Sequence, residues 1–129
     1  MTNKIKILIV EDDFFLRKLC QKKLEQKEFE VFLAEDGNKG IEEAKKNQPD
    51  LILLDIILPG INGFEVLKTL KKDLATASIP IVLLSNLGQK EDIDKGLALG
   101  ANDYLIKAHF SPQEIVDKIE EVLMSIKSK

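Results

Sequence analysis

The sequence is poor in the features that mark secreted or membrane-inserted proteins. Its 129 residues include a single cysteine, Cys20, so no disulfide can form within the chain, and a reducing cytoplasm is the expected location. The longest apolar stretches, residues 5–10 and 51–58, have the length of strands and are far too short to span a membrane. Residues 1–4 have no signal-peptide layout, so we expect no membrane insertion.

The sequence also lacks an excess of basic residues. It contains 19 Lys and Arg against 22 Asp and Glu, a net charge of −3 at pH 7. Because non-specific nucleic-acid binding depends on a basic face, we predict no direct contact with nucleic acid. No Gly-rich phosphate loop follows the first apolar stretch, which disfavours a nucleotide-binding domain.

What the sequence does contain is an alternation of short apolar runs and helical patterns. The runs cover residues 5–10, 51–54, 79–84 and 104–106, and a weaker β-prone segment covers 30–34. Uninterrupted apolar runs are typical of strands buried on both faces, as in a parallel sheet between helices. We therefore predict an α/β fold, a doubly wound five-stranded parallel sheet built from five β-α units in one domain.

The helical segments show one apolar face each and clear end signals. Ser111 and Glu114 form a predicted capping box, Asn62 and Asp36 are predicted N-caps, and Gly100 is expected to end a helix. Spacings of three and four positions put three sets of residues on shared apolar faces: Leu16, Leu19, Cys20 and Leu24; Phe64, Leu67 and Leu70; and Ile115, Ile119, Val122, Leu123 and Ile126.

Polar residues stand where four of the predicted strands stop. Doubly wound sheets carry their sites beyond the carboxyl ends of the strands, so we expect these side chains to converge at one edge. They are Glu11, Asp12 and Asp13 after the first strand, Asp55 at the third, Ser85 at the fourth and Lys107 at the fifth.

Such a cluster has a definite chemistry. Crowded carboxylates bind a hard divalent cation, and an open site of this kind suits Mg²⁺. An aspartate such as Asp55 can attack a phosphoryl donor and become an aspartyl-phosphate. The transfer needs neutralisation of the equatorial oxygens, which the metal, the Lys107 ammonium and the Ser85 hydroxyl would supply.

Each residue also has a plainer interpretation. The acidic triplet can cap the first helix, Asp55 can be a turn residue, Ser85 a loop serine and Lys107 a solvated surface lysine. These interpretations would have to hold independently at the ends of four strands, which favours a common site.

At these positions the sequence resembles the receiver domains of response regulators in two-component signalling. The resemblance covers essentially the whole chain and is most specific in residues 49–64, PDLILLDIILPGINGF. Glu11 and Asp12 match the acidic pair, Ser85 the hydroxyl position and Lys107 the lysine. The resemblance implies a flavodoxin-like fold with strand order 2-1-3-4-5, and a single receiver domain over residues 1–129 without an output domain.

The resemblance also implies roles for individual residues. Asp55 would be the phosphoacceptor, assisted by Ser85 and Lys107. Asp12, Asp55 and the backbone carbonyl of Ile57 would hold Mg²⁺, with Glu11 acting through water. Asp13 would be a neighbour and not a ligand.

The implied function is a phosphorylation-activated switch and not an enzyme, because the only chemistry is on Asp55 itself. On phosphorylation Ser85 would move toward the phosphoryl group, Tyr104 would turn inward, and the face of the fourth helix, fifth strand and fifth helix would change shape. The implied partners are a sensor histidine kinase or phosphotransfer protein and a downstream protein target that the sequence does not identify.

Three departures from the family pattern lead to further predictions. Ala108 replaces the usual proline after the lysine, where a cis bond before alanine would cost about 3 kcal/mol, so we predict a rebuilt loop over residues 107–112. Asn86 replaces a smaller residue and should narrow access to the site. Ile57 and Leu87 cannot orient an attacking water, which predicts slow self-hydrolysis and a long-lived signal.

Two other functions remain as alternatives. A phosphohydrolase with an aspartyl intermediate typically has a second aspartate two residues after the nucleophile, where this chain has Ile57. A pseudo-receiver that binds partners without phosphorylation is disfavoured by the intact set of site residues. His109, the only histidine, lacks a second metal ligand and is interpreted as a surface loop residue, and Cys20 as core packing.

Overall fold

The computed structural model describes residues 4–127. Within them one sheet is formed by β1 (Lys6–Val10), β2 (Glu30–Ala34), β3 (Leu51–Asp55), β4 (Ile81–Ser85) and β5 (Asp103–Ile106). All neighbouring strands are parallel and their order is β2-β1-β3-β4-β5, which confirms the predicted flavodoxin-like topology. The predicted strand ends shift by up to two residues, and both Asp55 and Ser85 are the last residues of their strands.

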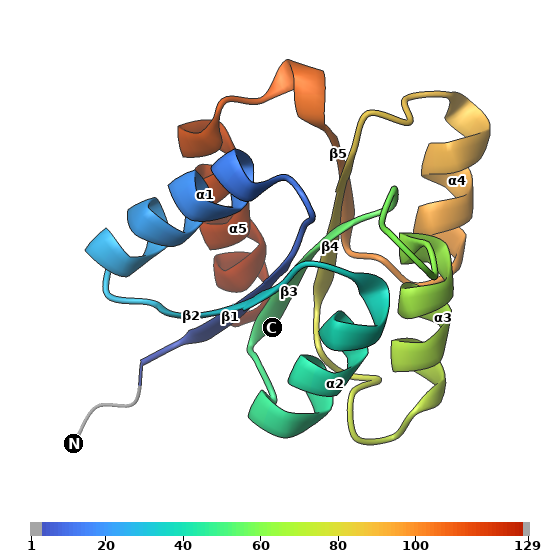
Figure 1. Ribbon diagram of the computed structural model, residues 1–129, viewed down its shortest axis with the longest axis horizontal. Helices are drawn as coiled ribbons and strands as arrows, with labels where there is room; N and C mark the ends of the chain where they lie inside the picture. Colours follow the sequence, from blue (N-terminus) through green and yellow to red (C-terminus); the bar gives the residue numbers. More distant parts are fainter. Residues whose placement is uncertain (1–3, 128–129) are drawn as a thin grey trace.

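The helices form a layer on each face of the sheet. The helices α1 (Phe14–Gln26) and α5 (Pro112–Lys127) cover one face, and α2 (Gly37–Asn47), α3 (Gly63–Lys72) and α4 (Lys90–Ala98) cover the other (Figure 1). A short 3₁₀ turn, η1 (Lys107–His109), lies between β5 and α5. None of the helices within residues 4–127 combines the length and apolar character needed to cross a membrane.

The core consists of two apolar clusters, one on each side of the sheet. Along β1, Leu8 and Val10 pack toward α2 and α3, whereas Ile7 and Ile9 pack toward α1 and α5. Successive side chains of a strand point to opposite faces, so a strand covered on both sides needs apolar residues at every position. This is the physical reason for the uninterrupted apolar runs in the sequence.

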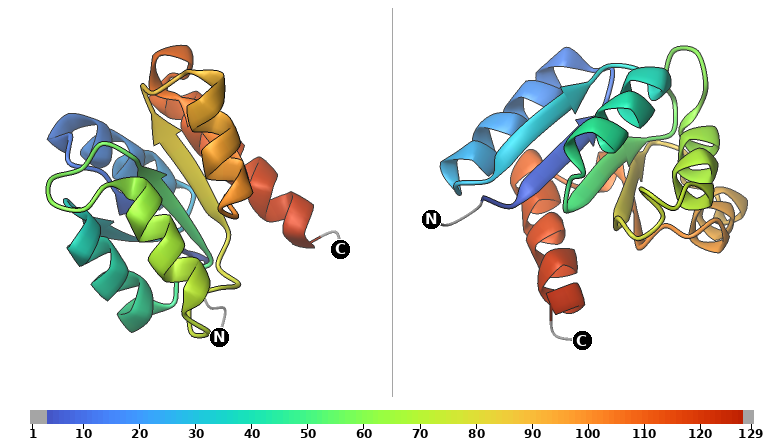
Figure 2. Two further views of the ribbon diagram at one scale, coloured as in Figure 1. Left: turned by 90° about the vertical axis from the view of Figure 1, so that its right-hand side faces the viewer. Right: turned by 90° about the horizontal axis from the view of Figure 1, so that it is seen from below.

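Two residues assigned to apolar helix faces by their spacing are in fact exposed. Leu19 is 47% exposed because the buried stripe of α1 passes through Cys20 and Leu24. Ile126 is 41% exposed, and it lies in the last turn of α5, which extends past the sheet (Figure 2). The other members of the three sets are buried or partly buried against the clusters.

The predicted helix starts are confirmed. Ser111 Oγ accepts from the Glu114 N–H at 3.2 Å while Glu114 Oε1 accepts from the Ser111 N–H at 2.9 Å, a complete capping box. Asn62 and Asp36 each accept a backbone N–H three residues on. Gly100, with φ of 109°, follows α4 as expected for a residue that ends a helix.

Cys20 is expected to be unreactive while the protein is folded. Its side chain is 1% exposed in the cluster between the sheet and α1, and burial raises the pKa of the thiol to about 11. The thiolate is the reactive form, so labelling by a maleimide at pH 8 should be slow in buffer and fast in denaturant. Rapid stoichiometric labelling of the folded protein would contradict the core-packing interpretation.

Candidate functional site

The carboxyl ends of the strands bring the predicted site residues to one edge of the sheet. Glu11 and Asp12 follow β1, Asp55 ends β3, Ser85 ends β4, and Lys107 follows β5. The parallel strands all run toward this edge (Figure 1). Residues up to 96 positions apart in the chain, from Glu11 to Lys107, thereby become neighbours.

The ammonium of Lys107 lies between two buried carboxylates. Its Nζ is 2.7 Å from Asp55 Oδ2 and 2.8 Å from Glu11 Oε1. Glu11 and Asp55 are each only 2% exposed, whereas Asp12 is exposed. The site therefore has a closed inner part, where charges are poorly solvated, and an open mouth at Asp12.

Burial changes the acidity of these groups. It raises the pKa of Glu11 to about 7, although the Lys107 ammonium and the Asp13 N–H oppose this shift. Burial also disfavours the charge on Lys107, but the hydrogen bond to Asp55 and the close contact with the Glu11 carboxylate outweigh it and raise the pKa of the ammonium. Lys107 is therefore a cation at any physiological pH, held where negative charge accumulates.

The three acids fit a hard divalent cation. Glu11, Asp12 and Asp55 each offer a carboxylate oxygen within 4.8 Å of the others. Glu11 Oε1 is buried and makes no hydrogen bond of regular geometry, its ion-pair contact with Lys107 apart. An all-oxygen donor set with an open side suits Mg²⁺. The Ile57 carbonyl as a further ligand stays a prediction.

The acidic triplet was expected either to cap the first helix or to bind a cation. Asp13 does the first, while Glu11 and Asp12 belong to the acidic cluster. Its Oδ1 accepts from the Phe15 N–H at 3.0 Å and the Leu16 N–H at 3.2 Å, so it caps α1. Its own N–H donates to Glu11 Oε2 at 3.0 Å. Asp13 is thus a helix cap that also orients Glu11, and it is not one of the three clustered acids. That Asp13 is not a metal ligand stays a prediction.

Ser85 and Tyr104 both form a hydrogen bond with Leu87, in the loop that follows β4. Ser85 is fully buried, and its Oγ accepts from the Leu87 N–H at 3.3 Å. The Tyr104 hydroxyl donates to the Leu87 carbonyl, and its ring packs beside Gly96 of α4. Tyr104 therefore lies on the inner side of α4 here, and its coupled movement with Ser85 stays a prediction.

The segment after Lys107 is a short turn with an ordinary peptide bond before Ala108. No cis peptide bond occurs within residues 4–127, so the Lys107–Ala108 bond is trans. The chain forms the turn η1 here, and His109 is exposed on it, as interpreted from the sequence. A loop path different from that of other family members stays a prediction.

Sequence reasoning missed two residues that shape the site. Arg17 is only 8% exposed, and its Nη1 donates to the Glu11 carbonyl at 2.6 Å, which fixes the backbone beside the acids. Its position among the apolar residues of α1 was the available signal. Gly63 lies so close to the Asp55 carbonyl that a Cβ would come within 2.3 Å of the oxygen.

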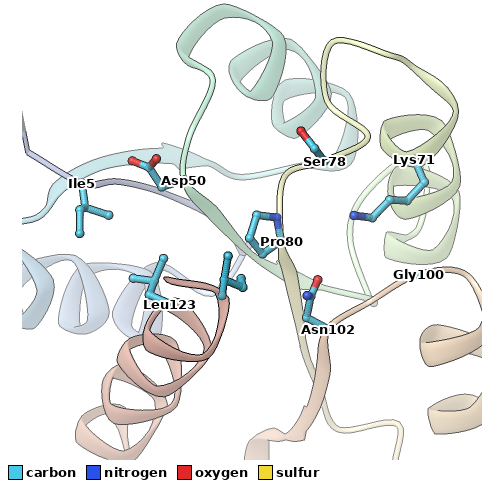
Figure 3. Close-up of a pocket in the computed structure, with 9 residues that line it drawn as sticks. Ile5, Asp50, Lys71, Ser78, Pro80, Gly100, Asn102 and Leu123 are labelled. Atoms are coloured by element: carbon cyan, nitrogen blue, oxygen red, sulfur yellow. The ribbon is translucent and has the colours of Figure 1, made fainter. Parts of the chain in front are cut away.

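A cavity of about 400 Å³ lies at the opposite edge of the sheet from the acidic cluster (Figure 3). Its lining includes the residues that directly precede four strands: Ile5 before β1, Asp50 before β3, Pro80 before β4 and Asn102 before β5. Lys71 also lines it and donates to the carbonyls of two loop residues. None of the predicted site residues lines this cavity.

The fold and the acidic edge with its lysine define a receiver-type α/β protein. Residues 7–120 match the family model of the response regulator receiver domain. The chain belongs to this family.

Relatives and solved structures agree with this assignment. The chain is 41% identical over 121 residues to the phosphate regulon transcriptional regulatory protein PhoB of Escherichia coli (strain K12), covering 94% of this chain and 52% of PhoB. The CheY-like receiver domain protein from Methanospirillum hungatei superposes with a TM-score of 0.89 at 26% identity, covering 98% of each chain. Chemotaxis response regulator CheY4 of Vibrio cholerae gives 0.86 at 28% identity, covering 93% of this chain and 99% of CheY4. The chain spans about half the length of the curated relative.

Proposed function

We propose that this chain is a phosphorylation-activated switch that accepts a phosphoryl group on Asp55. The observation that carries the proposal is the Lys107 ammonium held between Asp55 and Glu11 beside the exposed carboxylate of Asp12. Mg²⁺, when bound by the acids, would neutralise phosphoryl oxygens. The same set of groups argues against a pseudo-receiver that acts without phosphorylation.

Different residues of the chain have different roles in the proposed phosphoryl transfer. One Asp55 oxygen attacks phosphorus and forms a P–O bond, while the bond from phosphorus to the donor's leaving atom breaks and that atom keeps the electron pair; the leaving atom is a nitrogen in a phosphohistidine and an oxygen in acetyl phosphate. Lys107 is placed to neutralise a phosphoryl oxygen, and Ser85 offers a hydroxyl from the neighbouring strand. The Ile57 N–H donates to Asp55 Oδ1 at 3.2 Å and orients the carboxylate.

The proposal extends to partners and location. A sensor histidine kinase or phosphotransfer protein would supply the phosphoryl group, and a protein target would respond to the α4–β5–α5 face, in the cytoplasm. Relatives such as PhoB are transcriptional regulators, and the part of PhoB outside the match is not represented in this chain. We propose no direct nucleic-acid contact for the receiver itself.

Phosphorylation can be tested with a small donor. Incubation with acetyl phosphate and Mg²⁺ should add the mass of one phosphoryl group to the wild type and none to Asp55→Asn. Asp13→Asn is the matched control, because it changes an adjacent acid but keeps the capping oxygen. An unmodified wild type, or equal modification of Asp55→Asn, would overturn the proposal.

The phosphorylated form is expected to be long-lived. The Ile57 side chain is 56% exposed next to Asp55 and has no group that could hold an attacking water. Substituting Ile57→Asn should shorten the phosphoryl half-life roughly tenfold, less than the hundredfold or more of a general base, because an amide can orient a water but cannot take its proton. Following the phosphorylated mass over time gives the half-life, and a wild-type half-life of seconds would contradict the prediction.

A further inference from the structure

We propose that Asn86 is a positioning residue that ties the loop carrying Ser85 to the turn carrying Lys107. Its Oδ1 accepts a hydrogen bond from the backbone N–H of Ala108 at 3.1 Å. The inference deepens the proposed function and rests on it, since its consequence is the placement of Lys107 for phosphoryl transfer to Asp55.

The bond depends on two of the three departures from the family pattern, Ala108 and Asn86. A proline at position 108 would have no N–H to donate, and a small apolar residue at position 86 would have no oxygen to accept. Asn86 and Ala108 stand 22 positions apart in the sequence, where nothing connects them. The structure makes them the two ends of one hydrogen bond.

The contact lies directly beyond the end of the sheet ladder. In the β4–β5 register Ser85 lies opposite Ile106, the last residue of each strand. Asn86 and Lys107 follow immediately, so the chains would be free to separate at the point where the site begins. The hydrogen bond from the Ala108 N–H to Asn86 Oδ1 continues the link between the two chain segments beyond Lys107. The backbone of Lys107 is thereby held on both sides, by the β4–β5 pairing at Ile106 and by this bond at Ala108.

Holding this backbone matters because the lysine side chain is long. Four rotatable bonds separate the Lys107 backbone from the ammonium that contacts Asp55 and Glu11. If the backbone is already anchored, less conformational entropy is lost when the ammonium is held at these contacts. The same loop is held at Leu87, whose N–H donates to Ser85 Oγ and whose carbonyl accepts from Tyr104. The bond of Asn86 is thus the third hydrogen bond that holds residues 85–87, after the two made by Leu87.

The expected effect is on the reaction rate more than on stability. Asn86 and Ala108 are both exposed, so water replaces the bond readily when it is broken. The acids that would bind Mg²⁺ make no contact with Asn86 or Ala108 among the hydrogen bonds of the described residues. Loss of the tie should therefore slow phosphoryl transfer while the melting temperature and the affinity for Mg²⁺ stay unchanged.

A double-mutant cycle tests the tie. Asn86→Leu removes the acceptor at similar volume, and Ala108→Pro removes the donor. Each should slow phosphorylation by acetyl phosphate roughly three- to tenfold, and the double variant should be no slower than the slower single variant. Ala108→Ser is the conservative variant: it keeps the N–H, and its rate should stay within about twofold of the wild-type rate.

Several outcomes would overturn the inference. They are rate losses that multiply in the double variant, an Asn86→Leu rate equal to the wild-type rate, or Ala108→Ser as slow as Ala108→Pro. If the wild type itself takes up no phosphoryl group, the proposed function fails, and hydrogen exchange of the Ala108 amide decides on the tie. Faster exchange in Asn86→Leu than in the wild type would support the bond, and equal exchange would refute it.

Discussion

Replacing Lys107 with methionine is expected to slow phosphorylation of Asp55 by at least about a hundredfold, the typical loss when one group that stabilises transition-state charge is removed. The ammonium lies 2.7 Å from the attacking carboxylate, on the side where phosphoryl oxygens must be neutralised. Methionine keeps a chain of similar length and apolar character but carries no charge, so the change isolates the electrostatic contribution.

The same substitution should tighten Mg²⁺ binding. Lys107 competes with the metal for oxygens of Glu11 and Asp55, and its removal leaves two buried carboxylates without a counter-charge. Titration calorimetry with Mg²⁺ and mass spectrometry of the phosphorylation reaction measure the two effects on one protein. Lys90→Met, at an exposed pair with Asp94 on α4, is the matched control and should change neither. A slower reaction with weaker Mg²⁺ binding would contradict the assigned role of Lys107.

Substituting Gly63→Ala is expected to destabilise the protein by about 3 kcal/mol or more. A Cβ at this position would come 2.3 Å from the Asp55 carbonyl oxygen and 2.6 Å from Ile56 Cα, and neither backbone atom can move without shifting the end of β3. The Gly63 N–H also donates to the Ile56 carbonyl at 2.7 Å, which holds the start of α3 against the site. The clash would therefore disturb the phosphoacceptor as well as the fold.

Urea unfolding measures this loss as a lower transition midpoint. Gly88→Ala is the control, because its Cβ would meet only the end of the Ile106 side chain, at 3.2 Å, which can rotate away. The control should change the free energy of unfolding by less than about 1 kcal/mol. Equal midpoints for Gly63→Ala and the wild type would show that the loop after β3 adapts, contrary to the close packing described above.

The architecture could be predicted from the sequence because its signals are local. Consecutive apolar residues at 51–54 require a strand covered on both faces, and the Ser111–Glu114 box places the start of α5 without reference to the rest of the chain. Parallel topology then placed Asp55, Ser85 and Lys107 at one edge. Their convergence could be predicted because each of these residues stands at the end of a predicted strand.

Other features depend on how the helices and strands pack against one another, which local sequence signals do not determine. Burial of Arg17 against the Glu11 carbonyl and the exposure of Leu19 follow from how α1 lies on the sheet, which helical spacing alone does not determine. The bond between Asn86 and Ala108 exists only because β4 and β5 end side by side.

What the sequence by itself determined is therefore the order of strands and helices, their caps and the set of polar residues at the strand ends, since each depends on residues close together in the chain. Only the tertiary structure decided which acid of the triplet caps α1, namely Asp13, and how the Lys107 ammonium is held between Glu11 and Asp55. The physical reason is that pairing, burial and altered acidity arise from atoms a few ångströms apart in space, whatever their separation along the chain.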